Sequence, residues 1–178
     1  MNRVAVFGNA GGGKSTLAKR LAAITGLPLH PLDLIQFTAG GGKVPDGEFI
    51  RAHADLMRCD RWIIDGYGSV ATAWERFGKA DTLVYVDLPI ATHYWHVTKR
   101  FIKGQFATPE GWPENSPIWR STLSSYKVIR LCHRHLTPKY RTLVAQMATS
   151  KRVHHLRSRG EMTAFIDAVR REFAMPRN

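Results

Sequence analysis

The residues with the clearest chemical meaning lie near the N-terminus, where the chain reads Gly8-Asn-Ala-Gly-Gly-Gly-Lys14-Ser15 and matches G-x-x-x-x-G-K-[ST] in full. An apolar run precedes this motif and an amphipathic segment follows it, which is the strand–loop–helix context of a phosphate-binding loop. Glycines let successive amides face one phosphate chain, while Lys14 can bridge the β- and γ-phosphates and the Ser15 hydroxyl can bind Mg²⁺. The residues predicted to bind a nucleotide here are Gly8, Asn9, Ala10, Gly11, Gly12, Gly13, Lys14, Ser15 and Thr16.

A second glycine-lysine run, Ala39-Gly-Gly-Gly-Lys43, repeats the middle of the first. However, Phe37 stands where the motif needs its first glycine, Val44 stands where it needs serine or threonine, and no helix opens directly after the run. We therefore predict a surface loop that can close over an acceptor molecule, and not a second phosphate loop.

Three aspartates, Asp33, Asp65 and Asp87, follow apolar runs that read as strands. The carboxyl ends of parallel strands meet at one edge of a sheet, and that edge also carries the phosphate loop. Asp65 is the natural Mg²⁺ ligand, acting through water, or else a strand-end cap or turn residue. Asp33 can accept a proton from a substrate hydroxyl, help to hold Mg²⁺, or serve as a helix cap or turn residue. Asp87 is predicted to cap the helix that follows it.

Basic residues concentrate on both sides of a proline-marked stretch in the second half of the chain. They are Lys99, Arg100, Lys103, Arg120, Lys127, Arg130 and Arg134. The last four share one helical face, which can close over a transferring phosphoryl group, with Arg130 as the residue that neutralises it. The same face can instead be merely solvated, or it can hold nucleic-acid phosphates with the help of Trp119 and Tyr126. Against nucleic acid, no binding module is recognisable and both aromatics also fit a helix core.

The histidines and cysteines give no sign of a metal site. His93 and His96 are three residues apart on a predicted helix, and His53 lies on an apolar stripe. We predict surface or core-edge roles for all eight histidines. Cys59 and Cys132 are far apart, which favours a reducing cytosolic location over a disulfide scaffold or a structural zinc site.

The whole chain of 178 residues, with 44% hydrophobic residues, is predicted to form one domain over residues 1–178. No segment approaches the roughly 20 apolar residues of a membrane span, and we expect no membrane contact. The formal charge of +12 indicates an anionic partner. Phosphate esters and nucleic acids both satisfy that charge, and the oligomeric state is left open.

Short apolar runs alternate with amphipathic segments along the chain. Strands are predicted at 3–8, 27–34, 61–65, 82–88 and 152–156. Helices are predicted at 15–25, from Asp46 as a cap, from Pro89, at 117–134 with Ser116 as a cap, at 138–149 with Thr137 as a cap, and after Ser158 with a capping box to Glu161. Residues 104–116 are predicted to be an exposed loop. This alternation predicts a three-layer α/β fold, with a parallel sheet, helices on both faces and a helical insertion.

With these residues in place, the chain resembles the adenylate-kinase-related P-loop kinases, in particular the small bacterial group of DNA topology modulation or adenylate-kinase-like proteins. The resemblance rests on Gly8–Thr16, His30–Asp33, Asp60–Gly66, Ala80–Pro89, Lys99-Arg100 and Leu156–Glu161. It implies a five-stranded parallel sheet in the order 2-3-1-4-5, a lid at about residues 100–134 and an acceptor-side region at about residues 33–58. It also implies ATP as phosphoryl donor and Mg²⁺ as cofactor.

The resemblance further implies roles for three arginines and limits the acceptor. Arg100 falls where the family places an arginine over the adenine and phosphates, and Arg157 and Arg159 fall where it closes over the base. True adenylate kinases follow the Asp-Gly of the third strand with Phe-Pro-Arg, whose arginine grips AMP, whereas Tyr67-Gly-Ser follows here. Asp33 resembles the acidic residue that shikimate- and gluconate-type kinases use to engage an acceptor hydroxyl.

The sequence therefore predicts an ATP- and Mg²⁺-dependent phosphotransferase acting on a small molecule or nucleotide, with a hydroxyl acceptor favoured over AMP. A nucleic-acid-associated, nucleotide-binding regulatory protein is the alternative, because the basic charge also suits DNA or RNA. A P-loop protein that binds nucleotide without chemistry is a third option, which intact Lys14, Ser15 and Asp65 disfavour.

Overall fold

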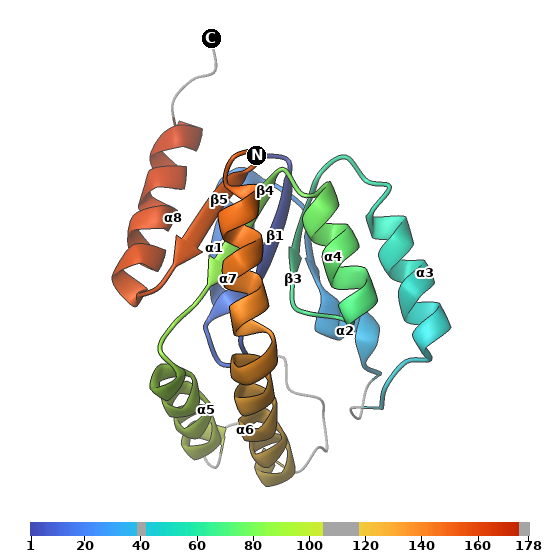
Figure 1. Cartoon of the computed structure of the whole chain (residues 1–178), viewed down its shortest axis with the longest axis vertical. Coiled ribbons are helices and arrows are strands. Elements are labelled where there is room, and N and C mark those ends of the chain that lie inside the picture. The colour runs from blue at the N-terminus through green and yellow to red at the C-terminus, as the bar shows by residue number, and fades with distance from the viewer. Residues whose placement is uncertain (39–41, 105–117, 175–178) are drawn as a thin grey trace.

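The computed structural model describes residues 1–38, 42–104 and 118–174, and its centre is a five-stranded sheet (Figure 1). The strands are β1 (Arg3–Gly8), β2 (Leu29–Pro31), β3 (Trp62–Asp65), β4 (Thr82–Val86) and β5 (Arg152–Leu156). Their order is β2-β3-β1-β4-β5 and every pairing is parallel. The predicted fold class and strand order are confirmed, and β1, which leads into the phosphate loop, lies in the middle of the sheet.

Helices cover both faces of this sheet, and alternate residues of β1 point to the two resulting cores. Val4 and Val6 pack in one core with α1 (Lys14–Thr25) and α8 (Arg159–Ala174). Ala5 and Phe7 pack in the other core. The helices on that second face are α3 (Asp46–Leu56), α4 (Val70–Lys79) and α7 (Thr137–Met147), and the short α2 (Leu32–Gln36) lies at the end of β2. Burial on both faces explains why the three central strands, β1, β3 and β4, read as continuous apolar runs.

Two further helices, α5 (Ile90–Gly104) and α6 (Ile118–His135), pack against each other beyond the carboxyl ends of the strands (Figure 1). The Thr98 and Tyr126 hydroxyls lie 2.6 Å apart, and the Tyr94 and Tyr126 rings meet edge to face at 5.5 Å between centroids. Tyr126 thus packs within this helix pair. Among the helices that the structure describes, none has both the length and the apolar character needed to cross a bilayer.

Several predicted boundaries need correction. Asp46 does not cap α3: the N-cap is Pro45, and the Asp46 carboxylate accepts a hydrogen bond from Lys43 Nζ at 2.7 Å. Thr137 is the first residue of α7 rather than its cap. Neither α2 nor α4 was predicted. The predicted loop at 104–116, including the cap Ser116, falls almost wholly outside the described residues, as do Ala39–Gly41 of the second glycine-lysine run and the side chains of Trp119 and Arg120.

Candidate nucleotide-binding site

The phosphate loop joins β1 to α1, and its glycines are required by its backbone. Gly8 has a φ of 140°, and a Cβ atom at this position would lie 2.2 Å from the carbonyl oxygen of Val86 in the adjacent strand. Gly13 is the N-cap of α1 with a φ of 80°. Only glycine tolerates both the left-handed conformation and the close approach. The loop therefore wraps tightly around the N-terminus of α1, where unpaired amides and the helix dipole favour an anion.

Lys14 and Asn9 hold the loop in this curled form. Lys14 Nζ donates a hydrogen bond to the carbonyl oxygen of Asn9 at 2.8 Å, so the ammonium lies over the loop. The buried Asn9 side chain accepts a hydrogen bond from Ala10 N at 2.8 Å and donates one to the carbonyl oxygen of Ile129 at 2.9 Å. Because Ile129 belongs to α6, the Asn9 amide ties the phosphate loop to the insertion.

Two histidines of α5 hold the other side of the loop. His96 Nδ1 donates to the carbonyl oxygen of Gly11 at 2.7 Å, and His93 places Nδ1 2.8 Å from the carbonyl oxygen of Ala10. His93 also places Nε2 3.1 Å from the carbonyl oxygen of Leu88. Burial lowers the pKa of His93, and a neutral imidazole donates to one of its two carbonyl partners. Both histidines lie at the edge of the core, as predicted, since His93 is buried and His96 half-buried. What the sequence did not reveal is that their rings hold loop carbonyls.

Asp65 ends β3 directly beside the loop. Its carboxylate is buried, and burial raises its pKa, while the nearby Lys14 ammonium and a hydrogen bond from Ser15 oppose that rise. One carboxylate oxygen, Oδ1, has no hydrogen-bond partner among the described residues. A buried, unpaired oxygen beside a lysine and a hydroxyl is the donor set that Mg²⁺ uses with nucleotide phosphates. The residues predicted to hold Mg²⁺, Ser15 and Asp65, thus fit the ion.

Asp33 and Arg100 approach the same edge of the sheet from different elements. Asp33 lies in the first turn of α2, whose N-cap is Pro31, and its side chain is exposed. Its negative charge acts on Asp65, whose pKa it raises, and on Arg100, whose pKa it raises against a larger lowering by desolvation. The structure therefore brings these three charged groups within electrostatic range of one another.

A cavity of about 530 Å³ opens over the loop. Its wall includes the loop glycines Gly11, Gly12 and Gly13, together with Thr16, Arg100 and Arg159. The cavity has the size of a typical cofactor site. Three arginines line it together with the loop glycines, because Arg20 of α1 joins Arg100 and Arg159.

Two other predicted arginines lie elsewhere. Arg157 lines a different cavity, on the other side of the turn that follows β4. Arg130 is exposed on α6, next to Ile129, and lines neither cavity. Of the arginines predicted to contact the nucleotide, the structure therefore gathers Arg100 and Arg159 at the phosphate loop.

Asp87 has a different environment from the one predicted. Its carboxylate accepts hydrogen bonds from Arg141 Nε at 2.8 Å and Nη2 at 3.1 Å, and from His155 Nε2 at 2.8 Å. These contacts join α7 and β5 to the end of β4. The Asp87 carboxylate therefore binds Arg141 and His155, and does not cap the following helix as predicted.

A buried arginine that sequence reasoning missed supports the loop after Asp65. Arg76 of α4 is fully buried and donates from Nη2 to the carbonyl oxygens of Gly66 at 3.1 Å and Tyr67 at 3.0 Å. It also donates from Nη1 to His53 Nε2 at 3.3 Å. Burial lowers the pKa of Arg76 to about 10. Arg76 therefore positions the backbone that follows the proposed Mg²⁺ ligand.

The sheet order, the phosphate loop on the central strand and the helix pair beyond the strand ends define the P-loop kinase fold. Among solved structures, the chain is similar to a shikimate kinase from Acinetobacter baumannii in complex with shikimate, with a TM-score of 0.61 and 15% identity over 95% of this chain and 90% of that chain. It is also similar to a shikimate kinase from Bacteroides thetaiotaomicron, with a TM-score of 0.55 and 12% identity over 98% of this chain and 99% of that chain. No protein-family model matches the sequence, and no curated protein matches it in a sequence search. The likeness establishes the fold.

Proposed function

We propose that the protein is an ATP- and Mg²⁺-dependent phosphotransferase that moves the γ-phosphate of ATP to a hydroxyl group of a small molecule or nucleotide. The observation that carries the proposal is the unpaired, buried Asp65 oxygen beside Lys14 and Ser15, at the mouth of a phosphate loop that other elements hold in place. A loop that served only as a turn would have no need of a desolvated carboxylate at this position.

The loop amides and Lys14 would hold the donor phosphates, while Ser15 and Asp65 would hold Mg²⁺, which neutralises phosphate charge when bound. Arg100 and Arg159 line the cavity and would contact the base and phosphates of ATP. Asp33 would orient the acceptor hydroxyl or take its proton. Such a site works mainly by bringing the reactants together and neutralising charge.

The same proposal assigns roles to whole segments of the chain. Residues 1–178 would form one kinase domain, with a lid at about 100–134 that carries Arg130 to the phosphates and an acceptor side at about 33–58. The basic side chains of Lys127, Arg130 and Arg134 are exposed on α6, which suits a surface that meets a polyphosphate. We also propose that the chain is related to the bacterial adenylate-kinase-like group that includes the DNA topology modulation proteins, and that it is located in the cytosol.

The acceptor is proposed to be a hydroxyl compound other than AMP. Ser69 stands at the position of the arginine that grips AMP in adenylate kinases. Asp33 is exposed near Asp65 and does not cap α2. The solved neighbour from Acinetobacter baumannii binds shikimate, which makes shikimate the first hydroxy acid to test.

The test is ADP release from Mg-ATP with a panel of shikimate, gluconate, nucleosides, nucleoside monophosphates and DNA. One small acceptor should stimulate release strongly, and Asp33→Asn should lose that stimulation by about 100-fold or more. Asp60→Asn is the matched control, because Asp60 is exposed and precedes β3 at the opposite edge of the sheet. Stimulation by DNA alone would favour the regulatory alternative, and a fully active Asp33→Asn enzyme would refute the role of Asp33.

A further inference from the structure

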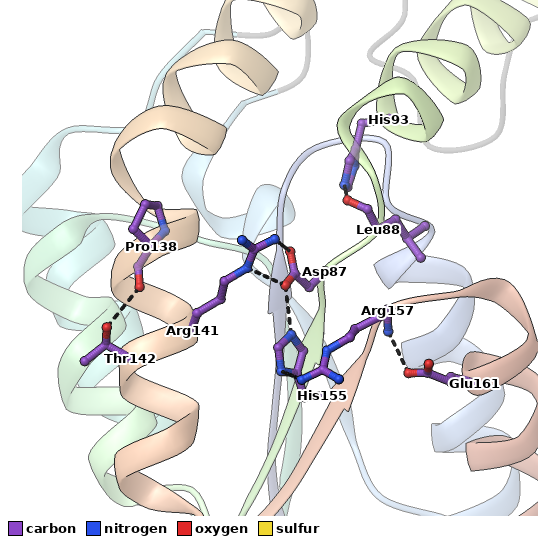
Figure 2. A network of polar contacts seen from close by, with 9 residues as sticks. All are labelled: Asp87, Leu88, His93, Pro138, Arg141, Thr142, His155, Arg157 and Glu161. Atoms are coloured by element: carbon purple, nitrogen blue, oxygen red, sulfur yellow. Dashed lines mark hydrogen bonds and ion pairs between the residues drawn. The ribbon is translucent and has the colours of Figure 1, made fainter.

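A second cavity, of about 650 Å³, lies on the α7 side of the strand ends. It is formed by the turn after β4, the end of β5 and one side of α7, which Figure 2 shows around Asp87, Arg141 and His155. Much of its wall is apolar. The apolar lining residues are Leu88, Pro89, Val144, Ala145, Ala148 and Val153. Nothing in the phosphotransferase proposal uses this cavity.

The polar end of the cavity is a chain of charged groups (Figure 2). Asp87, whose side chain is only 6% exposed, is held by the bidentate Arg141 guanidinium and by His155. These partners lower the pKa of Asp87, so the carboxylate is ionised and its charge is compensated. Asp87 therefore offers the cavity little negative field.

Arg157 supplies a positive charge that the Asp87–Arg141 ion pair does not balance. Its Nη2 donates a hydrogen bond to His155 Nδ1 at 3.3 Å, and its backbone N–H, not its guanidinium, contacts Glu161. Within the described part of the chain, no carboxylate forms an ion pair with the Arg157 guanidinium. His133 of α6 reaches the same cavity. With Asp87 balanced by Arg141, the lining has a net positive charge.

We propose that this cavity is a binding site for a small organic anion, one that carries a carboxylate or phosphate group on an apolar ring. The Arg157 guanidinium and the His133 ring would bind the anionic group, and the wall formed by Leu88, Val144 and Ala148 would bind the ring. A planar guanidinium pairs well with either anion, and an apolar wall with a few convergent polar groups is the usual character of a small-molecule site.

The proposed site is separate from the phosphate loop but adjoins it. Leu88 is the residue that lines both cavities, and the carbonyl oxygen of Leu88 contacts His93, which also contacts Ala10 of the loop. A ligand against the Asp87–Pro89 turn would therefore touch the wall of the nucleotide cavity. The proposal does not depend on the chain being a phosphotransferase, because neither Arg157 nor His133 lines the phosphate-loop cavity.

The test is calorimetric titration of the full chain with phenyl phosphate. Benzoate is expected to bind in the same way. Inorganic phosphate has the anionic group without the ring, and benzyl alcohol has the ring without the charge, so both should bind much more weakly. The Arg157→Gln variant removes the charge, and Ala148→Trp fills the cavity without changing any charge. Lys139→Gln is the matched control, since Lys139 is an exposed cation of α7 outside the lining. Lys14→Ala removes the competing phosphate site.

We expect phenyl phosphate to bind the wild type, Lys139→Gln and Lys14→Ala equally, and to bind Arg157→Gln and Ala148→Trp about tenfold more weakly. Circular dichroism of both weakened variants verifies that they are folded. Loss of binding in Lys14→Ala would assign the anion to the phosphate loop and overturn the proposal. Unchanged binding in both Arg157→Gln and Ala148→Trp, or no measurable binding to the wild type, would also overturn it.

Discussion

His53 should make the protein lose stability in mild acid. The ring is fully buried, and burial together with the neighbouring Arg76 and Lys79 charges lowers its pKa from 6.5 to about 4, against a smaller opposing effect of Glu75. The unfolded chain therefore binds a proton that the folded chain excludes, so stability is complete above about pH 6.5 and falls as the pH drops toward about 4. Between about pH 7.5 and about pH 5 this single group should cost about 2 kcal/mol.

Urea unfolding, followed by tryptophan fluorescence at several pH values, measures this loss. His53→Gln removes the titration while its amide oxygen can still accept the hydrogen bond from Arg76, so its free energy of unfolding should vary less with pH by about 2 kcal/mol over the same range. Other histidines titrate in both proteins and cancel in the difference. His135→Gln, at an exposed position, should keep the wild-type pH dependence. Parallel curves for wild type and His53→Gln would refute the reasoning.

Three further predictions concern the phosphate loop. Gly8→Ala should lower the free energy of unfolding by about 3 kcal/mol in urea titrations, because the new Cβ would clash with the Val86 carbonyl oxygen and the backbone has a positive φ. The control Gly47→Ala, in open space on α3, should raise the free energy of unfolding by up to about 1 kcal/mol. His96→Leu removes the hydrogen bond to Gly11 and should raise the KM for ATP about fivefold in ADP-release assays, and an unchanged KM would contradict the holding role of α5. Lys14→Ala should reduce ADP release by about 100-fold or more and weaken ATP binding in calorimetry, and normal turnover would refute the site.

The centre of the sheet could be predicted because β1, β3 and β4 are short apolar runs, but α4 could not. The buried face of α4 carries Arg76 beside Ala73 and Phe77, so the periodicity of apolar residues is broken where the helix meets the core. Its start is marked by a capping box between Ser69 and Thr72, a weaker signal than the glutamate or glutamine usually found at the second position. An arginine inside a core is intelligible only once its backbone acceptors are known.

The site was predicted in part for a similar reason. The phosphate loop is local in sequence, so its motif and flanking elements identify it. The groups that hold it are distant: His93 and His96 lie 83 and 85 residues from the carbonyl groups that they contact, and Ile129 lies 120 residues from Asn9. Helical spacing indicates that two histidines share a face, but it does not reveal what that face will meet.

The same distances set an order of events during synthesis. The phosphate loop leaves the ribosome first, while the histidines of α5 and the α6 carbonyl that hold it emerge 83 to 120 residues later. A nascent chain that ends before α5 would contain every residue of the motif but would lack the contacts that hold the phosphate loop in its folded conformation. We therefore expect the proposed nucleotide site to form only after α5 and α6 have emerged from the ribosome.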